Sequence, residues 1–449
     1  MNKLFKKSII MLICIFIMVG FLLATAASGQ EEKKVLSIVE YYLADIGNTE
    51  QYNKMMVVYN SFEAEFGCKL DINSYSWSDS GMQLMIMNEA NALPDVAQYW
   101  YMGYGPLFVA KGMLDPMDSF IAETPNVKDN IEQRIMLKIN GKAYGISNNM
   151  MDLGLYVNKT ILDKNGIKAA PKTWQELRDT AIKCTDNTKG IYGIALDGGD
   201  EESLLVAATF IAQNGGHVGL FEGKQGINQP AAVEAVQFIV DMVNKDKSVP
   251  GYISSGMKEA RDIFCSGGTA FLIDGANNIR QIIPKNPEFE WYTTTLPMGK
   301  QNGTSIAPGD TGYSLCSTSK NKDLAWEFIR YMTLNEEVVK QIITSRINYP
   351  VSLKSLNEFQ LASETYGKYL IPFDDQLKLG GILDFYSEMP NQIQSALNIW
   401  REQLHLAVLG KITVQEAMNA VASGWDKLNA DWVTQYGTGT AKTVAPPIW

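Results

Sequence analysis

The sequence contains little histidine and lacks the common motifs of nucleotide-binding and hydrolytic enzymes. The two histidines, His217 and His405, lie far from each other, from any cysteine pair and from acids at metal-ligand spacing. Isolated histidines of this kind are more typical of a surface or a helix face than of a metal site. The strings G-x-S-x-G, G-x-x-x-x-G-K-[ST] and G-x-G-x-x-G are absent, so no hydrolase nucleophile or phosphate loop is visible. We therefore expect no catalytic residues, no cofactor and no metal.

Basic residues are also too few for a nucleic-acid-binding surface. The chain has 39 Lys and Arg against 49 Asp and Glu, a formal net charge of −10. Binding to a phosphate backbone requires clustered cations, which this composition does not supply. We expect no nucleic-acid partner.

Cysteine is sparse and scattered. Beyond the N-terminal segment there are only Cys68, Cys184, Cys265 and Cys316, with no C-x-x-C pair among them. A chain of 449 residues buries enough apolar surface to fold without covalent cross-links. The spacing favours unpaired, buried thiols, and disulfides remain the alternative.

The first residues have the pattern of a secretory signal. Lys3, Lys6 and Lys7 precede an uncharged run of 15 residues, Ile9 to Leu23, and small residues follow at 24–26. A membrane span needs about 20 apolar residues, so the pattern favours cleavage over anchoring. We predict a signal peptide over 1–26 and an exported protein, periplasmic or extracellular and associated with the cell surface. Its mature chain would have 36 basic and 49 acidic residues, a net charge of −13.

Strand and helix patterns alternate along the rest of the chain. Strands are expected at 33–42, 68–76 and 93–99, with helices at 49–67 and 81–92 between them. Further on, extended runs are expected within 141–159, 269–275 and 289–297, and helices at 170–184, 229–247, 324–333, 393–410 and from 413. Thr173 and Thr413 are expected as N-caps, each with a Glu three residues later. The alternation predicts an α/β protein with mostly parallel sheets. Because no repeat and no Gly/Ser linker separates independent domains, two lobes joined by several chain crossings fit best.

Aromatic residues are abundant, with 17 Phe, 20 Tyr and 9 Trp. Tyr and Trp present a flat apolar face and a polar tip, which suits the C–H faces and hydroxyl groups of sugar rings. Aromatic and polar residues occur together in loops that follow expected strands, where open α/β sheets bind ligands. These loops are 40–48, 74–80, 97–105, 147–152, 196–202, 273–280 and 307–313. Tyrosines also pack loops together, but seven loops of the same character indicate a binding site.

Several segments, in this order and spacing, resemble one known family. They are LPDVAQYW (93–100), GKAYGISNNMMDLGLYVNKTIL (141–162), APKTWQEL (170–177), FIAQNGG (210–216), FCSGGTAFLIDGANNI (264–279), APGDTGYSLCSTSKNKDLAWEFIRYM (307–332) and INYPVSLKS (347–355). The chain resembles the extracellular solute-binding proteins of ABC importers, in the sugar-binding family that includes maltose-binding protein.

The resemblance implies a two-lobed type II binding-protein fold, with each lobe a mostly parallel sheet flanked by helices and the ligand cleft between the lobes. By position, the crossings are expected near 146–150, 307–312 and 347–352. The N-terminal lobe would hold 28–147 and 311–349, and the C-terminal lobe 149–308 and 351–449.

The resemblance also implies ligand-binding positions. Tyr99 is the first candidate for a cleft aromatic and Trp100 the second, followed by Trp77 and by Tyr42 in the first loop. The polar candidates and those at the crossings are Asn149, Met151, Asp200, Glu201, Asp274, Asn277, Asp310 and Arg346. Asn277 stands where many sugar binders of the family have a tryptophan, so one stacking surface is missing.

We interpret the chain as a monomeric binding protein that captures a carbohydrate and delivers it to the permease of an ABC importer. One alternative is an exported glycan-degrading hydrolase. Another is the same fold with a polyol, a glycerol phosphodiester or a peptide-like compound as its ligand.

Overall fold

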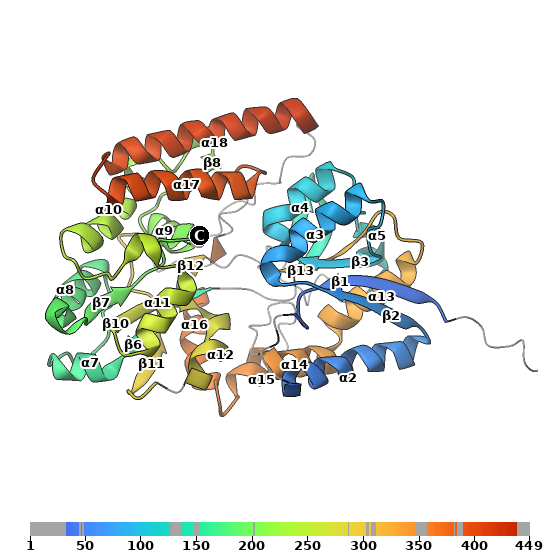
Figure 1. The fold of residues 1–449 in the computed structure, drawn as a ribbon, viewed down its shortest axis with the longest axis horizontal. Coiled ribbons are helices and arrows are strands. Elements are labelled where there is room, and N and C mark those ends of the chain that lie inside the picture. Colours follow the sequence, from blue (N-terminus) through green and yellow to red (C-terminus); the bar gives the residue numbers. More distant parts are fainter. Residues whose placement is uncertain are drawn as a thin grey trace, which may run out of the picture.

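The computed structural model describes most of the chain after the N-terminal segment. The described residues are 33–44, 46, 49–125, 127, 136–147, 152–200, 203–285, 287–301, 305–306, 311–346, 357–380, 382–383 and 389–437. They form two lobes, each built on its own β-sheet (Figure 1).

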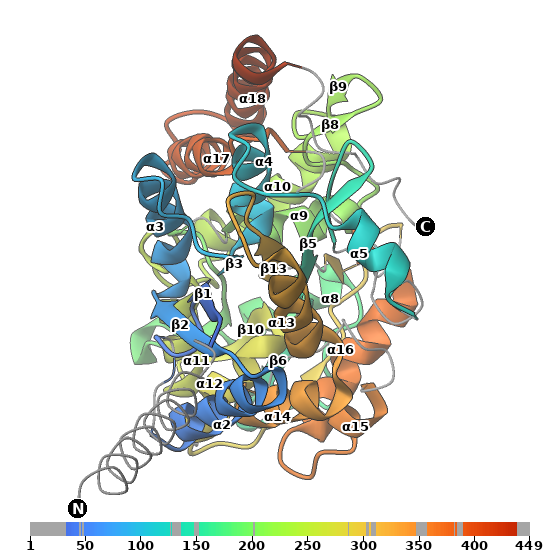
Figure 2. The same ribbon diagram turned by 90° about the vertical axis from the view of Figure 1, so that its right-hand side faces the viewer.

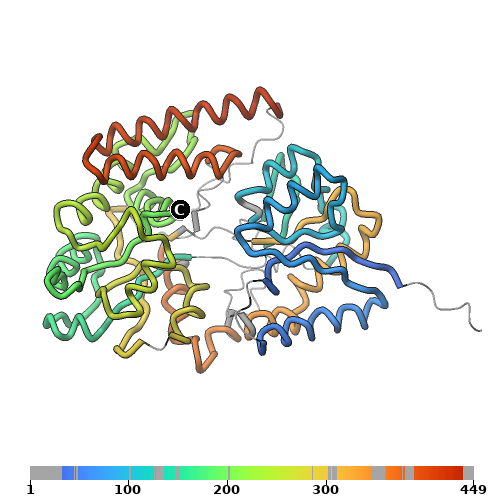
Figure 3. The backbone as a smooth tube through the Cα atoms, in the orientation of Figure 1, coloured from blue at the N-terminus to red at the C-terminus, as the bar shows by residue number. Residues whose placement is uncertain are grey.

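The first lobe combines the N-terminal part of the chain with a segment from much later in the sequence, as the blue-to-cyan and orange parts of the tube show (Figure 3). Its sheet has the strand order β2-β1-β3-β13-β5-β4. Its elements are β1 (Val35–Glu40), α2 (Thr49–Phe66), β2 (Lys69–Ser74), α3 (Trp77–Glu89), β3 (Val96–Tyr99), α4 (Tyr101–Ala110), α5 (Asp118–Glu123), β4 (Leu137–Ile139), β5 (Lys142–Ser147), β13 (Gly312–Leu315), α13 (Lys322–Leu334) and α14 (Glu336–Arg346).

The second lobe has a four-stranded sheet of order β11-β6-β10-β7 and two additional two-stranded pairs, β12-β14 and β8-β9. Its strands are β6 (Leu153–Asn158), β7 (Tyr192–Ala195), β8 (Leu220–Phe221), β9 (Lys224–Gln225), β10 (Thr269–Gly275), β11 (Trp291–Thr294), β12 (Ser305–Ile306) and β14 (Ile382–Leu383). Its helices are α7 (Lys159–Lys164), α8 (Trp174–Cys184), α9 (Ser203–Gln213), α10 (Pro230–Asn244), α11 (Met257–Cys265), α12 (Ile279–Ile282), α15 (Asn357–Leu361), α16 (Gly367–Gly380), α17 (Ile393–Val408) and α18 (Val414–Tyr436).

The two main sheets are mixed, which corrects the expectation of mostly parallel sheets. Strand β1 pairs in parallel with β2 and β3, and β10 pairs in parallel with β7. Strand β13 is antiparallel to β3 and β5, and β6 is antiparallel to β10 and β11. The reason lies in the connections between the lobes. A strand that follows a crossing enters its sheet from the edge facing the other lobe, so β6 and β13 run opposite to the strands that end there.

Local signals account for most element boundaries. The Thr173 and Thr413 hydroxyls accept hydrogen bonds from the backbone N–H groups of Glu176 and Glu416, as expected of N-caps. At Thr413 the Glu416 carboxylate also accepts from the backbone N–H of the cap residue, which completes a capping box. Helix α2 ends before Gly67, whose φ of +62° belongs to the left-handed region that favours glycine.

Two expectations about the loops were wrong. Trp77, expected in the loop after the second strand, is the first residue of α3, because Ser76 caps that helix by accepting from the Asp79 N–H. The segment after Tyr99, also expected as a loop, forms α4 from Tyr101 onward. Side chains in both segments are therefore held by helices rather than by flexible connections.

The cores are apolar and contain no cross-links. The largest fully buried side chains include Trp400 and Trp425 in the second lobe and Tyr59 and Phe62 in the first. All four cysteines beyond the N-terminal segment are free, and burial raises the pKa of the Cys184 thiol to about 11. The expectation of unpaired thiols is confirmed.

The capping box of α18 gives a test of this local stabilisation. We expect Thr413→Ala to lower the free energy of unfolding by about 1 kcal/mol, because the first turn loses a partner for its backbone N–H groups. Thr434→Ala, on the same helix, is the matched control, since the exposed Thr434 hydroxyl donates only to the Ala430 carbonyl oxygen. Urea denaturation followed by circular dichroism measures both variants, and equal losses would contradict the capping role.

Candidate functional site

The strand ends of the two sheets face each other. In the first lobe, β1, β2, β3 and β5 end at one edge and β13 begins there, as the strand pairing requires. In the second lobe, β7, β10 and β11 end at one edge and β6 begins there. The chain passes from the end of β5 to the start of β6, and from β12 to the start of β13. Because each passage joins one edge to the other, loops from both sheets meet between the lobes (Figure 1).

Two helices, one from each lobe, are in contact. Helix α4 of the first lobe contacts α17 of the second, and the two helices lie next to each other in both views (Figures 1 and 2). Trp100, Phe108, Leu397 and Trp400 belong to one buried apolar cluster, which therefore extends across both lobes. The aromatic residues that follow β3 lie beside this contact.

Trp77 and Trp100 form an aromatic pair at the facing edge of the first sheet. Their ring centroids are 5.6 Å apart with planes tilted by 38°. Trp77 follows the end of β2 and is partly exposed, whereas Trp100 follows the end of β3 and is 6% exposed. The Tyr104 ring meets Trp100 edge to face at 6.5 Å. These three rings form an aromatic wall, built by α3 and α4, beside the carboxyl ends of β2 and β3.

Two glycines allow these rings to pack so closely. A Cβ atom on Gly103 would lie 2.3 Å from the Trp100 ring, and a Cβ atom on Gly81 would lie 2.4 Å from the Tyr104 ring. Neither glycine has a positive φ, so the requirement is for space and not for backbone freedom. Gly81 and Gly103 thus leave the space in which the rings of Tyr104 and Trp100 pack.

Tyr99 and Tyr42 occupy core positions, which removes them from the candidate ligand contacts. Neither side chain has exposed surface. Tyr99 packs against Phe108 at 4.8 Å, its hydroxyl shares a hydrogen bond of 3.2 Å with the Ser314 hydroxyl, and burial raises its pKa. Tyr42 packs edge to face against Tyr41 at 4.9 Å. A ring enclosed on every side has no face for a sugar, so Trp77 and Trp100 replace Tyr99 as the leading aromatic candidates.

Asp274 is likewise a structural residue. Its carboxylate is fully buried and accepts from Arg261 Nε at 2.7 Å, from the Gly275 N–H at 2.8 Å and from Asn278 Nδ2 at 2.6 Å. Arg261, 4% exposed, also donates from Nη1 to Gln281 at 2.7 Å. This network fixes the 3₁₀ turn Ala276–Asn278 at the end of β10. Asp274 holds the loop, and its side chain has no exposed surface.

Asn277 lies in the middle of that turn and keeps an acceptor without a partner. Its backbone carbonyl accepts from Arg280 Nε at 3.2 Å, but its side-chain Oδ1 is buried and makes no hydrogen bond. Buried polar atoms in folded proteins are usually paired, so an unpaired one at a strand end is suited to a ligand or water donor. The position of Asn277 is consistent with ligand contact.

The loop after β7 is built by local hydrogen bonds. Asp197 Oδ1 accepts from the Gly199 and Asp200 N–H groups, and Asp200 Oδ2 accepts from the Met257 N–H at the start of α11. Asp200 is half-buried and has this structural role in the described conformation. The neighbouring ring of Tyr252 lies over Gly198, where a Cβ atom would approach within 2.5 Å of it.

The remaining candidates cannot be placed. Asn149, Met151, Glu201 and Asp310 lie outside the described residues. Arg346 is the last residue of α14, and its side chain also falls outside them. Their roles stay predictions.

Two buried polar residues near the facing edges were missed by sequence reasoning. Gln98, in β3, has no exposed surface. Its Oε1 accepts from the Tyr41 N–H at 3.3 Å and its Nε2 has no partner. Asp152, directly before β6, is fully buried with both carboxylate oxygens unpaired. In the sequence, both could have been found as polar residues in apolar surroundings: Gln98 lies within an otherwise apolar strand, and Asp152 lies directly before one.

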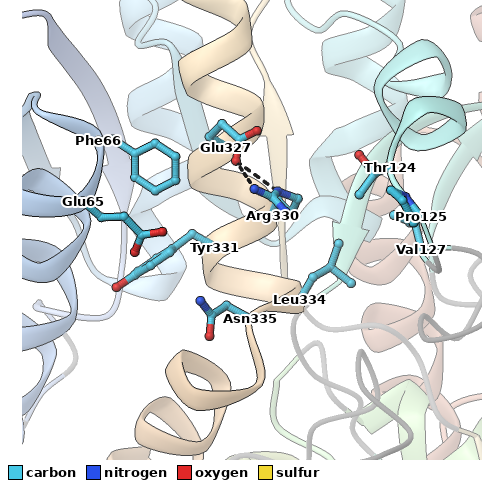
Figure 4. Close-up of a pocket in the computed structure, with 10 residues that line it drawn as sticks. All are labelled: Glu65, Phe66, Thr124, Pro125, Val127, Glu327, Arg330, Tyr331, Leu334 and Asn335. Atoms are coloured by element: carbon cyan, nitrogen blue, oxygen red, sulfur yellow. Dashed lines mark hydrogen bonds and ion pairs between the residues drawn. The ribbon is translucent and has the colours of Figure 1, made fainter.

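A cavity of about 290 Å³ lies elsewhere in the first lobe, between the end of α2, the segment after α5 and the second half of α13 (Figure 4). Phe66 and Tyr331 form part of its wall, and Arg330 is ion-paired with Glu327 beside it. None of the sequence-predicted ligand residues lines this cavity.

The described residues contain no cluster of three or more His, Cys, Asp and Glu side chains able to hold a metal ion. Within the same part of the chain, no helix has both the length and the apolar character needed to cross a membrane.

The sequence of this chain matches a family model described as bacterial extracellular solute-binding protein over residues 46–339, more than half of its length. The chain belongs to this family. Among related sequences, a binding protein of Brucella abortus (strain 2308) is 23% identical over 317 residues, which are 69% of this chain and 74% of that protein. The maltotriose-binding protein of Pyrococcus abyssi (strain GE5 / Orsay) is 22% identical over 263 residues, which are 57% of this chain and 54% of that protein.

Solved structures of solute-binding proteins have the same fold. An ABC transporter solute-binding protein of Thermotoga lettingae TMO, bound with α-D-tagatose, gives a TM-score of 0.74 at 21% identity and covers 88% of this chain and 100% of that one. The GacH receptor of Streptomyces glaucescens, solved unliganded and with acarbose, gives a TM-score of 0.72 at 20% identity and covers 89% of this chain and 100% of that one. The two-lobed α/β fold of this solute-binding protein is thus shared along nearly its whole length.

The Arg261–Asp274 pair gives a stability test. We expect Arg261→Met to lower the free energy of unfolding by about 3–5 kcal/mol, because it leaves the Asp274 carboxylate buried without its cation. The double variant Arg261→Met/Asp274→Leu should recover part of this loss. Arg330→Met, which breaks a surface pair 45% and 33% exposed, is the control and should cost less than about 1 kcal/mol. Chemical denaturation measures all three, and an Arg261→Met loss no larger than the control would contradict the buried-pair assignment.

Proposed function

We propose that this solute-binding protein captures a carbohydrate between its lobes and delivers it to the membrane permease of an ABC importer. The observation that supports this most strongly is the wall formed by Trp77 and Trp100 at the facing edge of the first sheet. The unpaired Asn277 Oδ1 lies at the facing edge of the second sheet.

The chemistry of these groups suits a sugar. The apolar face of a pyranose or furanose ring stacks on an indole, and its hydroxyl groups donate to and accept from side-chain amides. Asn277 offers an acceptor without a protein partner at the facing edge of the second sheet. A ligand held between the edges can satisfy both lobes at once, and this favours the arrangement in which they approach each other.

The names of related proteins support the same ligand class. The Pyrococcus relative is named for maltotriose, and an arabinooligosaccharide-binding protein of Bacillus subtilis (strain 168) is 25% identical over 218 residues, which are 47% of this chain and 49% of that protein. We propose a mono- or oligosaccharide for this chain. Because Asn277 replaces a tryptophan common at its position in the family, the site has one fewer stacking surface than a typical maltodextrin binder.

We also propose that the protein catalyses no reaction, works as a monomer and is exported to the periplasm or the cell surface. The proposal of export rests on the charged, apolar and small-residue pattern of residues 1–26. Incubation with oligosaccharides tests the absence of catalysis, since release of shortened products would favour the hydrolase alternative instead.

A thermal-shift screen over mono- and oligosaccharides, followed by calorimetric titration, tests the proposed ligand class and site. We expect at least one saccharide to raise the unfolding temperature, because ligand bound to the native state stabilises it. Trp77→Ala and Trp100→Ala should each weaken that binding by about 1–3 kcal/mol, roughly 5- to 150-fold, through loss of a stacking surface.

Two variants control for indirect effects. Tyr99→Phe should bind with unchanged affinity, since the Tyr99 ring is enclosed in the core. Tyr52→Ala removes an aromatic ring that is 43% exposed on α2 and should also leave binding unchanged. Equal affinity of the Trp77 and Trp100 variants with the parent would refute the site, and the absence of any saccharide shift would refute the ligand class.

A further inference from the structure

Asp152 is an acidic residue in surroundings that oppose its charge. Its side chain has no exposed surface, and neither carboxylate oxygen has a hydrogen-bond partner. Its backbone carbonyl accepts from the Ala276 N–H at 3.0 Å. An ionised carboxylate deprived of water and of partners costs several kcal/mol, so burial raises the pKa of Asp152 well above its ordinary value. The described conformation therefore favours the neutral acid.

Elements next to the β5–β6 and β12–β13 passages meet around this residue, together with α16 of the second lobe. Asp152 directly precedes β6, which is the next strand along the chain after β5. The next residue, Leu153, exchanges hydrogen bonds with the Ser305 hydroxyl of β12, the strand that precedes the return to β13. On the same face of β6, Gly154 lies against the Phe373 ring of α16, which follows the passage from α14 to α15. Asp152 thus lies at the base of the connection between the lobes.

Among the described residues, the charged groups around Asp152 do not compensate its charge. From α16, the Asp374 carboxylate acts on it as a like charge, and Lys378 is already paired with Asp374 at 2.6 Å and is 66% exposed. From α11 and β10, Arg261 and Asp274 neutralise each other. Tyr156, an ionisable residue of β6 on the same face as Asp152, is buried. Its hydroxyl donates to the Gly275 carbonyl oxygen. Serine is the polar residue that β12 contributes.

We propose that Asp152 is a protonatable positioning residue of the hinge, the region where the passages between the lobes adjoin β6. When Asp152 is neutral, it favours the described arrangement of the lobes. When it is ionised, it favours a rearranged hinge in which its carboxylate is hydrated. This inference rests on the proposed function for its consequence in ligand capture, but not for the conformational change itself. Any rotation of one lobe against the other must be absorbed where the connecting elements meet, and we expect such a rotation to admit water to the Asp152 carboxyl, which the described conformation encloses.

The direction of the pH effect follows from the raised pKa. A conformation in which an acid has a raised pKa binds the proton more tightly, so it is favoured at low pH. It loses that advantage as the pH rises from the ordinary pKa of about 3.8 through the raised one. Within this window, the ratio of the two lobe arrangements changes by up to about tenfold per pH unit. Ligand affinity should follow the same pH dependence, because the two arrangements bind it differently.

Small-angle X-ray scattering of the ligand-free protein between pH 4 and 8 tests the conformational part. We expect the radius of gyration of the parent to change with pH, and Asp152→Asn to keep one value throughout. Asp152→Ser serves as a second variant if Asn is not tolerated. Asp431→Asn, an exposed residue of α18, is the matched control and should retain the parent's dependence. A parent that does not change, or an Asp152→Asn variant that changes as the parent does, would overturn the proposal.

Titration with a saccharide found in the screen, at pH 4.5 and 7.5, tests the functional consequence. We expect the affinity of the parent to differ between the two pH values by several-fold or more and that of Asp152→Asn to stay constant. Affinity weakened equally at both pH values in Asp152→Asn would make Asp152 a direct ligand contact and overturn the hinge role. Stabilisation of the parent but not of Asp152→Asn by calcium or sodium would assign the carboxylate to a cation and also overturn it.

The two proposals fail in different ways. If no saccharide binds at any pH while the scattering change is present in the parent and absent in Asp152→Asn, the ligand class is wrong and the hinge role stands. If a saccharide binds but neither scattering nor affinity responds to Asp152, the hinge role is wrong and the ligand class stands.

Discussion

The arrangement of this protein depends on one constraint, that the passages from β5 to β6 and from β12 to β13 join the facing edges of two sheets. This constraint reverses the direction of β6 and β13 within their sheets. It also brings the ends of β1, β2 and β3 opposite those of β7 and β10, so that loops far apart in the sequence surround one space. The aromatic wall, the turn at Asn277 and the buried Asp152 all owe their positions to it.

The groups at these edges divide into those that build the site and those that remain available to a ligand. Asp274, Arg261 and Asn278 use their polar atoms on one another and hold the turn that carries Asn277. Gly81 and Gly103 give the space in which the rings of Tyr104 and Trp100 pack. What stays unpaired is the Asn277 Oδ1 in the second lobe, and this acceptor together with the two indole rings of the first lobe carries the proposed capture of a carbohydrate.

Much of the local structure could be predicted from the sequence because the signals are local. The Thr413 cap with Glu416, the end of α2 at Gly67 and the apolar strand β10 depend on residues within a few positions of one another. The site was harder to predict. Tyr99 and Trp100 are adjacent aromatic residues. No short-range pattern predicts that the strand of Tyr99 pairs with β13 or that the Trp100 ring packs against Trp77.

The sequence by itself therefore determined the fold class and the positions of most helices and strands, since periodicity, capping and composition act over short distances. Only the tertiary structure decided which aromatic residues lie at the facing edges and that Asp274 serves the loop rather than a ligand. It also revealed that Asp152 is buried without a partner. The burial of Tyr99 and of Asp152 depends on contacts between strands more than 100 positions apart, β3 with β13 and β6 with β10, which are formed only when the chain has crossed between the lobes and returned.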